Sequence, residues 1–124
     1  MAVETRGIRH VHLLVLDHTR SVAFYGEVFG MQVAFRHGSI LFLNSPEKRD
    51  DLALHLAQTE EEKVRVGQSG GYEHFGITVT DRTRLDEVIA MAQSSGGSLI
   101  AKGQYAPGVP YAYVSDPDGY VIEI

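Results

Sequence analysis

The sequence contains no cysteine, which excludes disulfide bonds and thiolate chemistry from any account of its function. A chain without cysteine is consistent with the cytoplasm, and a cytoplasmic location is what we expect. No apolar run approaches the roughly 18–20 residues of a membrane span, and the first residues lack the apolar core of a signal peptide. The polar residues therefore have to be explained by a site within the protein.

Positive charge is also scarce. Lysine and arginine total 11 against 16 aspartate and glutamate residues, which gives a formal net charge of −5. This balance disfavours nucleic acid and anionic membranes as partners. With 124 residues, 44% of them hydrophobic, the chain can form one compact unit with its own core. We therefore expect a single domain over residues 1–124 that acts on a small molecule.

What the sequence does contain is an internal repeat with an offset of 64 residues. The matched pairs are His10 and His74, Val15 and Val79, Asp17 and Asp81, Thr19 and Thr83, and Arg20 and Arg84. These matches fall in one register at the same strand-to-helix junction, which indicates a duplication. The sequence predicts one module over about 7–58 and a second over about 71–124, each with the order βαβββ. Neither module would bury enough surface alone.

Periodicity predicts the elements of each module. Alternation of apolar and polar residues predicts strands over 8–16, 32–36, 39–44, 51–57, 74–79 and 98–102, and a closing hairpin over 111–124. Helical spacing predicts helices over 17–30 and 81–95. The charged and glycine-rich stretch 58–71 is typical of a linker, with residues 60–63 as solvated surface. The fold class is α+β, with the two modules forming a curved mixed sheet and the helices on the outside.

Several predicted strands carry ionisable side chains on the face opposite their apolar residues. These side chains are His10, His12, His55, His74 and Glu123. If the sheets curve so that these faces converge, unpaired ionisable groups would share a cavity, which costs several kcal/mol each. A divalent metal would turn them into ligands, and imidazoles with one carboxylate suit Fe²⁺, Mn²⁺, Ni²⁺, Co²⁺ or Zn²⁺. The repeat favours His10 over His12, because only His10 matches a histidine in the second module.

Two motifs resemble those of a known superfamily. His-x-x-x-x-Val-x-Asp begins at His10 and is followed by Ser-x-x-Phe-Tyr, which ends at Tyr25. The first motif recurs at His74, and the chain closes with Asp-Pro-Asp-Gly-x-x-x-Glu, which ends at Glu123. This combination is similar to the vicinal oxygen chelate superfamily, which includes glyoxalase I, fosfomycin-resistance enzymes, extradiol dioxygenases and bleomycin-resistance proteins. The resemblance covers nearly the whole chain and implies paired βαβββ modules around one divalent metal ion.

The resemblance also implies roles for individual residues. His10, His74 and Glu123 would be metal ligands, and His55 occupies the fourth ligand position on the last strand of the first module. Glu123, His55 and Tyr113 would be the catalytic candidates. Such a metal binds vicinal oxygens of the substrate and stabilises the negative charge that develops on them. Members of the superfamily commonly pair modules across subunits, so we expect a homodimer. The loops expected to line the pocket rim are residues 36–38 and 104–110.

The resemblance leaves the reaction open. His55 in the fourth position favours lyase or isomerase chemistry of the glyoxalase type, although the first-strand arginine with which glyoxalase I binds glutathione is Leu14 here. An extradiol-type ring-cleaving dioxygenase is the alternative, favoured by Tyr113 ten residues before Glu123. A non-enzymatic, bleomycin-resistance-like binding protein is disfavoured because all three implied ligands are present. A fosfomycin-type transferase is disfavoured because no clear set of basic residues is available for a phosphonate.

Overall fold

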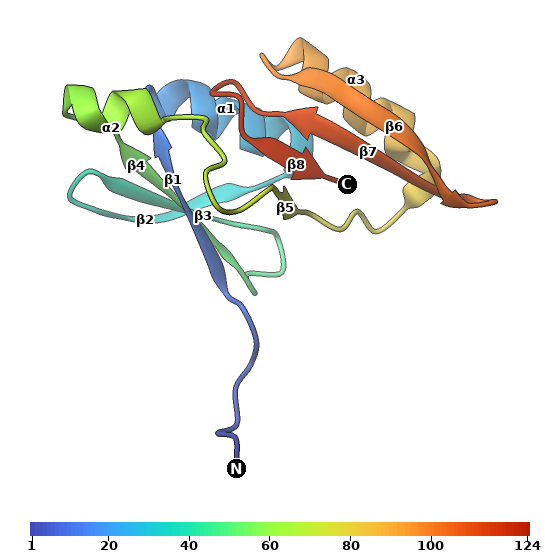
Figure 1. Cartoon of the computed structure of the whole chain (residues 1–124), viewed down its shortest axis with the longest axis horizontal. Coiled ribbons are helices and arrows are strands. Elements are labelled where there is room, and N and C mark those ends of the chain that lie inside the picture. The colour runs from blue at the N-terminus through green and yellow to red at the C-terminus, as the bar shows by residue number, and fades with distance from the viewer.

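The computed structural model describes all 124 residues and confirms the α+β class (Figure 1). Its strands form two separate four-stranded sheets. In spatial order, sheet A contains β1 (His10–Val15), β4 (Asp51–Leu56), β3 (Ile40–Asn44) and β2 (Gln32–His37). Sheet B contains β5 (Phe75–Gly76), β8 (Val121–Glu123), β7 (Val109–Ser115) and β6 (Ser98–Ala106). In both sheets the first strand runs parallel to the last and the other pairs are antiparallel, so the sheets share one topology.

Two helices occupy corresponding places in the repeat. Helix α1 (His18–Phe29) begins after Asp17, whose carboxylate accepts hydrogen bonds from the backbone N–H groups of Thr19 and Arg20. It ends at Gly30, where a φ of 68° favours glycine. In the second module the 3-10 helix η1 (Arg82–Arg84) leads into α3 (Leu85–Ser94), and Asp81 caps η1 in the same way. The predicted helices are therefore confirmed, with one turn of the second in 3-10 form.

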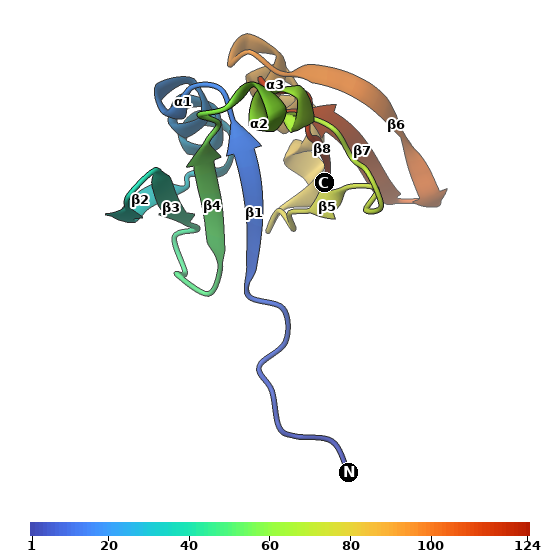
Figure 2. The same cartoon turned by 60° about the vertical axis from the view of Figure 1, so that its left-hand side comes forward.

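The core lies between the helices and one face of each sheet. Strand residues alternate, so one set is buried against the helices and the other set faces away. The buried set includes Leu13, Val15, Leu43, Leu54, Val114 and Ile122, and it packs against Phe24, Tyr25, Val88 and Ala92 of the helices. The opposite faces of the sheets, which we call the open faces, are not covered by helices α1 or α3 (Figure 2).

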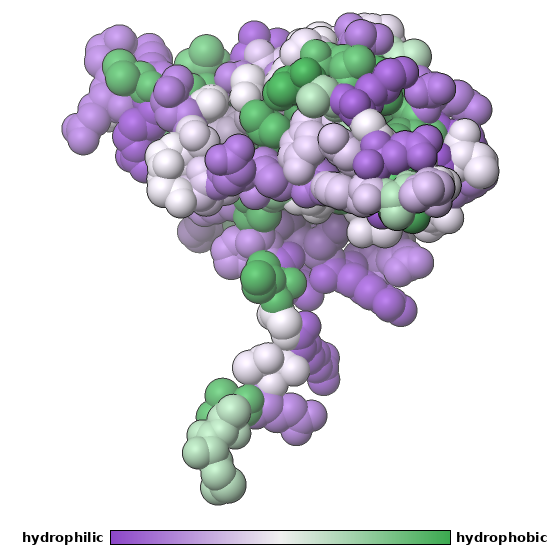
Figure 3. Space-filling view, turned by 45° about the vertical axis from the view of Figure 1, so that its right-hand side comes forward, coloured by the Kyte–Doolittle hydropathy of each residue, from purple (hydrophilic) through white to green (hydrophobic).

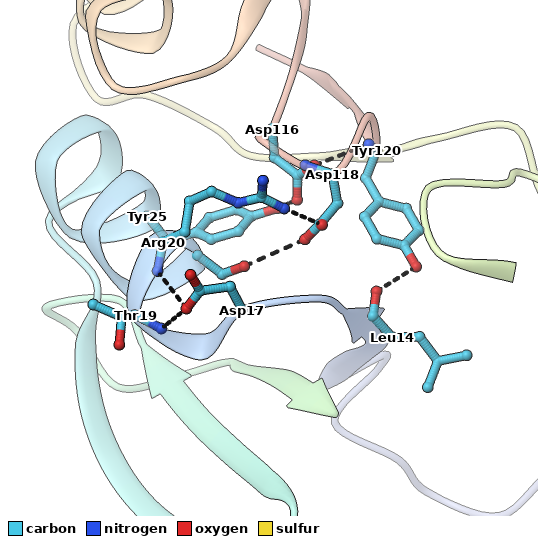
Figure 4. Close-up of polar contacts among 9 residues, drawn as sticks. Leu14, Asp17, Thr19, Arg20, Tyr25, Asp116, Asp118 and Tyr120 are labelled. Atoms are coloured by element: carbon cyan, nitrogen blue, oxygen red, sulfur yellow. Dashed lines mark hydrogen bonds and ion pairs between the residues drawn. The ribbon is translucent and has the colours of Figure 1, made fainter. Parts of the chain in front are cut away.

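A buried polar cluster joins the two halves of the chain (Figure 4). The turn between β7 and β8 carries Asp116, which is only 2% exposed and accepts a 2.7 Å hydrogen bond from the Tyr25 hydroxyl of α1. The carboxylate of Asp118 is fully buried and lies 2.6 Å from the Arg20 guanidinium. The Ser21 hydroxyl also donates to Asp118. We call these five residues the turn cluster.

The turn cluster explains why the Asp-Pro-Asp-Gly segment carries two carboxylates. A buried carboxylate is costly unless each oxygen has a donor. Asp116 meets this condition with three donors, namely the Tyr25 hydroxyl and the backbone N–H groups of Asp118 and Tyr120. Tyr120 adds a further bond between the halves, because its hydroxyl donates to the Leu14 carbonyl at 2.7 Å. The same turn that starts β8 therefore also fixes sheet B against α1 and β1.

Three sequence predictions need correction. The stretch predicted as a linker contains α2 (Glu60–Arg65), which begins with a capping box formed by Thr59 and Glu62. The predicted loop 104–110 is mostly strand, because β6 continues to Ala106 and β7 starts at Val109. The predicted strand 74–79 is reduced to the two residues of β5.

The first nine residues project from the body as an arm with exposed apolar residues Met1, Val3 and Ile8 (Figure 3). No helix has both the length and the apolar character to cross a membrane.

Candidate metal centre

The open face of sheet B places His74 beside Glu123. Strand β5 pairs with β8 so that Gly76 lies opposite Glu123, and His74 stands two residues before Gly76 on the same face. The His74 Nε2 atom is 2.9 Å from Glu123 Oε2. The other ring nitrogen, Nδ1, is buried without any hydrogen-bond partner. Buried polar atoms without partners are rare in native proteins, and one here marks this imidazole as a functional candidate.

The open face of sheet A holds a second pair of donors. Strand β1 pairs with β4 so that Leu14 lies opposite His55, and His12 stands two residues before Leu14. The His12 Nε2 atom is 3.1 Å from His55 Nδ1. Burial lowers the pKa of His12, with smaller contributions from His55 and His10. The lowered pKa favours the neutral imidazole, which is the form that binds metals.

The two pairs occupy equivalent places in their sheets. In each sheet, one residue of the first strand pairs with the donor on the last strand, and the histidine lies two residues before that paired residue. This equates His12 with His74, whereas the repeat register equates His10 with His74. His10 is an exposed residue on the same face as His12, but it pairs with Asp51 and lies further from His55 along the strand. His10 lines a cavity of about 200 Å³ between the edges of the two sheets.

The four ligands predicted from the sequence do not meet within one chain. The structure brings His74 to Glu123 and brings His55 to His12, but no group of three or more metal-binding side chains forms. In this structure His12 is the histidine beside His55, and the assignment of His10 as a ligand stays a prediction. The sequence left open whether a site forms within one chain or between two.

Tyrosines surround Glu123. The Tyr105 hydroxyl donates a hydrogen bond to Glu123 Oε1 and lies 3.5 Å from the Tyr113 hydroxyl. The Tyr113 ring packs edge-on against His74, with 5.0 Å between ring centroids. Hydrogen bonds from Tyr105 first and His74 second lower the pKa of Glu123, so its carboxylate is ionised at neutral pH. Sequence analysis singled out Tyr113 but missed Tyr105, because residue 105 lies in a stretch predicted as a loop.

Glu62 of α2 lies behind His55, with its Oε2 atom 4.0 Å from His55 Nε2. The capping box orients this carboxylate, because its other oxygen accepts hydrogen bonds from the backbone N–H groups of Gln58 and Thr59. The same bonds hold the pKa of Glu62 below its usual value. Sequence analysis assigned Glu62 to solvated surface. The spacing Thr59-x-x-Glu62 is a capping-box signature and could have predicted the short helix.

The donor pairs fit a metal ion. Two ligands of one tetrahedral metal ion, each about 2.1 Å from it, lie about 3.4 Å apart. The observed separations of 2.9 Å and 3.1 Å are hydrogen-bond distances, and each pair would have to open by only a few tenths of an ångström to hold an ion. Together the pairs offer three imidazoles and one carboxylate, a donor set suited to first-row divalent metals. Each pair alone supplies only half of the ligands that a tight site needs.

Comparison with known proteins identifies the family. Residues 7–124 match the model of the Glyoxalase/Bleomycin resistance protein/Dioxygenase superfamily, and the chain belongs to this superfamily. Among curated proteins, it is 29% identical over 128 residues to the lactoylglutathione lyase of Salmonella typhimurium, covering 93% of this chain and 88% of that protein. The resemblance that the sequence motifs indicated is therefore confirmed.

Solved structures of other proteins have a similar fold. A glyoxalase-related enzyme from Fulvimarina pelagi superposes with a TM-score of 0.74 at 28% identity, covering 97% of this chain and 87% of that one. The fosfomycin resistance protein FosX of Listeria monocytogenes, crystallised as an E126Q mutant with Mn(II) and 1S,2S-dihydroxypropylphosphonic acid, superposes with a TM-score of 0.75. At 18% identity, over 97% of this chain and 89% of FosX, this likeness shows the shared fold.

Proposed function

We propose that this protein is a divalent-metal-dependent enzyme of the glyoxalase-like type. It would carry out lyase or isomerase chemistry on a small oxygenated substrate that binds the metal through vicinal oxygens. The observation that carries the proposal is the pair of matched donor sets on the open faces, His12 with His55 and His74 with Glu123. Membership of the superfamily supports it.

We propose that the complete site forms in a homodimer. In one chain the two donor pairs lie on separate sheets, and no third donor joins either pair. A partner whose sheet B faces sheet A of the first chain would bring all four donors around one ion, and the twofold symmetry would create two such sites. A cysteine-free chain with these properties suits the cytoplasm, which is where we place it.

The metal ion would polarise a carbonyl or hydroxyl oxygen of the substrate and stabilise negative charge there. Within the chain, Glu123 is the candidate base, because its carboxylate is ionised and lies beside His74, where it would reach a carbon next to the carbonyl. The Glu123 carboxylic acid formed in this way would return the proton to the adjacent carbon, and His55, which lies 3.1 Å from His12, is the second candidate for this transfer. The Tyr113 ring packs against His74 and would hold that imidazole in place. Proton removal and return at adjacent carbons amounts to an isomerisation.

The aromatic residues keep a ring-cleaving dioxygenase as the second candidate. Tyr105 stacks on Tyr111 with 4.4 Å between ring centroids, and Phe35 stacks on Phe42 with 4.3 Å. Tyr105 and Phe35 are 60% and 54% exposed, so both offer a free ring face. The strand positions on the open faces hold no lysine or arginine. Flat aromatic surfaces without cations favour an uncharged ring over a phosphonate or a glutathione adduct.

Metal content tests the proposal. The full chain would be purified anaerobically without added metal or chelator, and its metals would be measured by mass spectrometry. We expect one equivalent per chain of nickel, cobalt, manganese or zinc, followed by metal-dependent turnover of 2-oxoaldehyde adducts or acyl thioesters. One equivalent of iron, with turnover of catechols, would favour the dioxygenase instead. A chain that holds no metal and takes up none on titration would reject both and leave a binding protein.

A further inference from the structure

Tyr105 lies at the end of β6, next to a register shift between Gln104 and Ala106. Alternation along β6 places Tyr105 on the same face as Gly103, which is the open face of sheet B, and its ring stacks there on Tyr111. Tyr111 in turn lies across Gly103, where an added Cβ would come within 2.8 Å of the Tyr111 hydroxyl. The glycine therefore allows the Tyr111 ring to lie flat, and that ring supports Tyr105.

The two oxygens of Glu123 have different partners. Oε1 accepts the hydrogen bond from the Tyr105 hydroxyl, while Oε2 faces His74 Nε2 at 2.9 Å. A carboxylate on a strand can rotate about its side-chain bonds, and a donor on one oxygen restricts that rotation. Tyr113, whose hydroxyl lies 3.5 Å from that of Tyr105, is the nearest alternative donor.

We infer that Tyr105 is a positioning residue, which holds the Glu123 carboxylate so that its Oε2 atom stays beside His74 and faces the metal. This inference rests on the proposed function, because it assigns Tyr105 to the proposed metal site. Groups that hydrogen-bond to a metal ligand orient it and raise the affinity for the metal. Tyr105 would do this without touching the metal itself.

The test is the affinity of the full chain for Zn²⁺, measured by competition with a chromophoric chelator. In Tyr105→Phe the ring and its stacking remain and only the hydroxyl is lost. We expect its dissociation constant to rise by about tenfold or more, in the range seen when such outer contacts are removed. The matched control is Tyr111→Phe, which loses a hydroxyl from the same stack that does not contact Glu123. We expect the affinity of this control to stay within about twofold of the wild type.

A double variant separates positioning from a general structural effect. In a Glu123→Gln background, Tyr105→Phe should weaken Zn²⁺ binding no further, because the oriented carboxylate is already gone. Additive losses, or an unchanged affinity in Tyr105→Phe while the wild type binds one equivalent, would overturn the inference and leave the metal site standing. A wild type that binds no equivalent would overturn the proposed function, and the role of Tyr105 with it. Thermal unfolding midpoints that match the wild type would show that the variants are folded.

Discussion

Sheets A and B share one topology but support their donor pairs in different ways. Behind His55 in sheet A stands Glu62, a carboxylate from α2. Behind Glu123 in sheet B stands Tyr105, a phenol from the extended β6–β7 hairpin. Helix α2 has no counterpart in the second module, and Tyr105 lies near the end of β6, which has nine residues where its counterpart β2 has six. The comparison teaches that the shared topology places a donor pair on each sheet, while the unequal segments determine how each donor is held.

The largest effect should come from removing a donor of sheet B. In His74→Ala the pair with Glu123 is lost, and we expect metal affinity to fall by on the order of 100-fold, the share of one ligand in a four-ligand site. His74 is absent from the hydrophobic core, so the fold should persist. Calorimetric titration with Zn²⁺ measures the loss, and His37→Ala on β2 is the control. Retention of one tightly bound equivalent would remove His74 from the ligand set.

A smaller loss of metal affinity is expected from variants of sheet A. There the repeat register favours His10 as the ligand, whereas the contact with His55 favours His12. We expect His12→Ala to weaken metal binding by about 30-fold and His10→Ala by less than about threefold, because His12 is the neighbour of His55. The same Zn²⁺ titration compares the two variants directly. The reverse order would show that the repeat register, and not the contact with His55, identifies the ligand on β1.

The contribution of the turn cluster to the stability of the fold can be tested by removing one of its hydrogen bonds. Tyr25→Phe removes the hydroxyl that donates to the buried Asp116, and an unsatisfied buried acceptor costs about 1–3 kcal/mol. We expect the free energy of unfolding in urea to drop by about 2 kcal/mol. Tyr72→Phe, which removes a hydroxyl from a ring that is 41% exposed, is the control and should change little. Equal effects in both variants would argue against the turn cluster as a stabilising contact.

Glu62→Gln sharpens the comparison of the two supports. Glutamine keeps the capping box, so α2 should remain, while the charge beside His55 is lost. We expect metal affinity to fall by about tenfold or slightly less, given the 4.0 Å separation. Glu61→Gln on the same helix is the matched control. If the two variants bind metal equally well, Glu62 is only a helix cap.

The smallest expected effect is a pH dependence of the turn cluster. Burial raises the pKa of Asp116 above its ordinary value of 3.8, so the folded chain binds that proton more tightly than the unfolded chain. The stability that this proton contributes is complete below the ordinary value and is lost as pH rises through the higher folded value. Asp116→Asn has no such proton. Urea unfolding at several pH values should therefore show wild type losing stability relative to Asp116→Asn as pH rises, and a constant difference would contradict this.

The sequence predicted the parts of the fold that depend on periodicity. The helices after Asp17 and Asp81 and the strands of sheet A appear close to where apolar spacing put them. Helix α2 was missed because it buries none of its residues and so has no apolar stripe to detect. The β6–β7 hairpin was cut short because Pro107, Gly108 and Pro110 read as a loop. In the structure, Pro110 lies within β7 opposite Gln104.

The candidate site was only partly predictable. Polar residues on strands pointed to His55, His74 and Glu123, and these do lie on the open faces. Choosing between His10 and His12 required knowing which residue of β1 pairs with His55, and strand register is set by tertiary packing. Tyr105 was missed for a different reason, because residues 104–110 were predicted as a loop whereas β6 continues to Ala106.

The turn cluster has one more consequence. It joins the halves through side chains, while the covalent connection between them runs through a segment whose two adjacent glycines, Gly70 and Gly71, are exposed. The two modules therefore resemble two proteins that associate through a specific interface and are also joined by a linker. Fragments separated at this point should find each other in solution. A chain of this kind is a natural scaffold for a split reporter, in which reassembly of two inert pieces restores the signal.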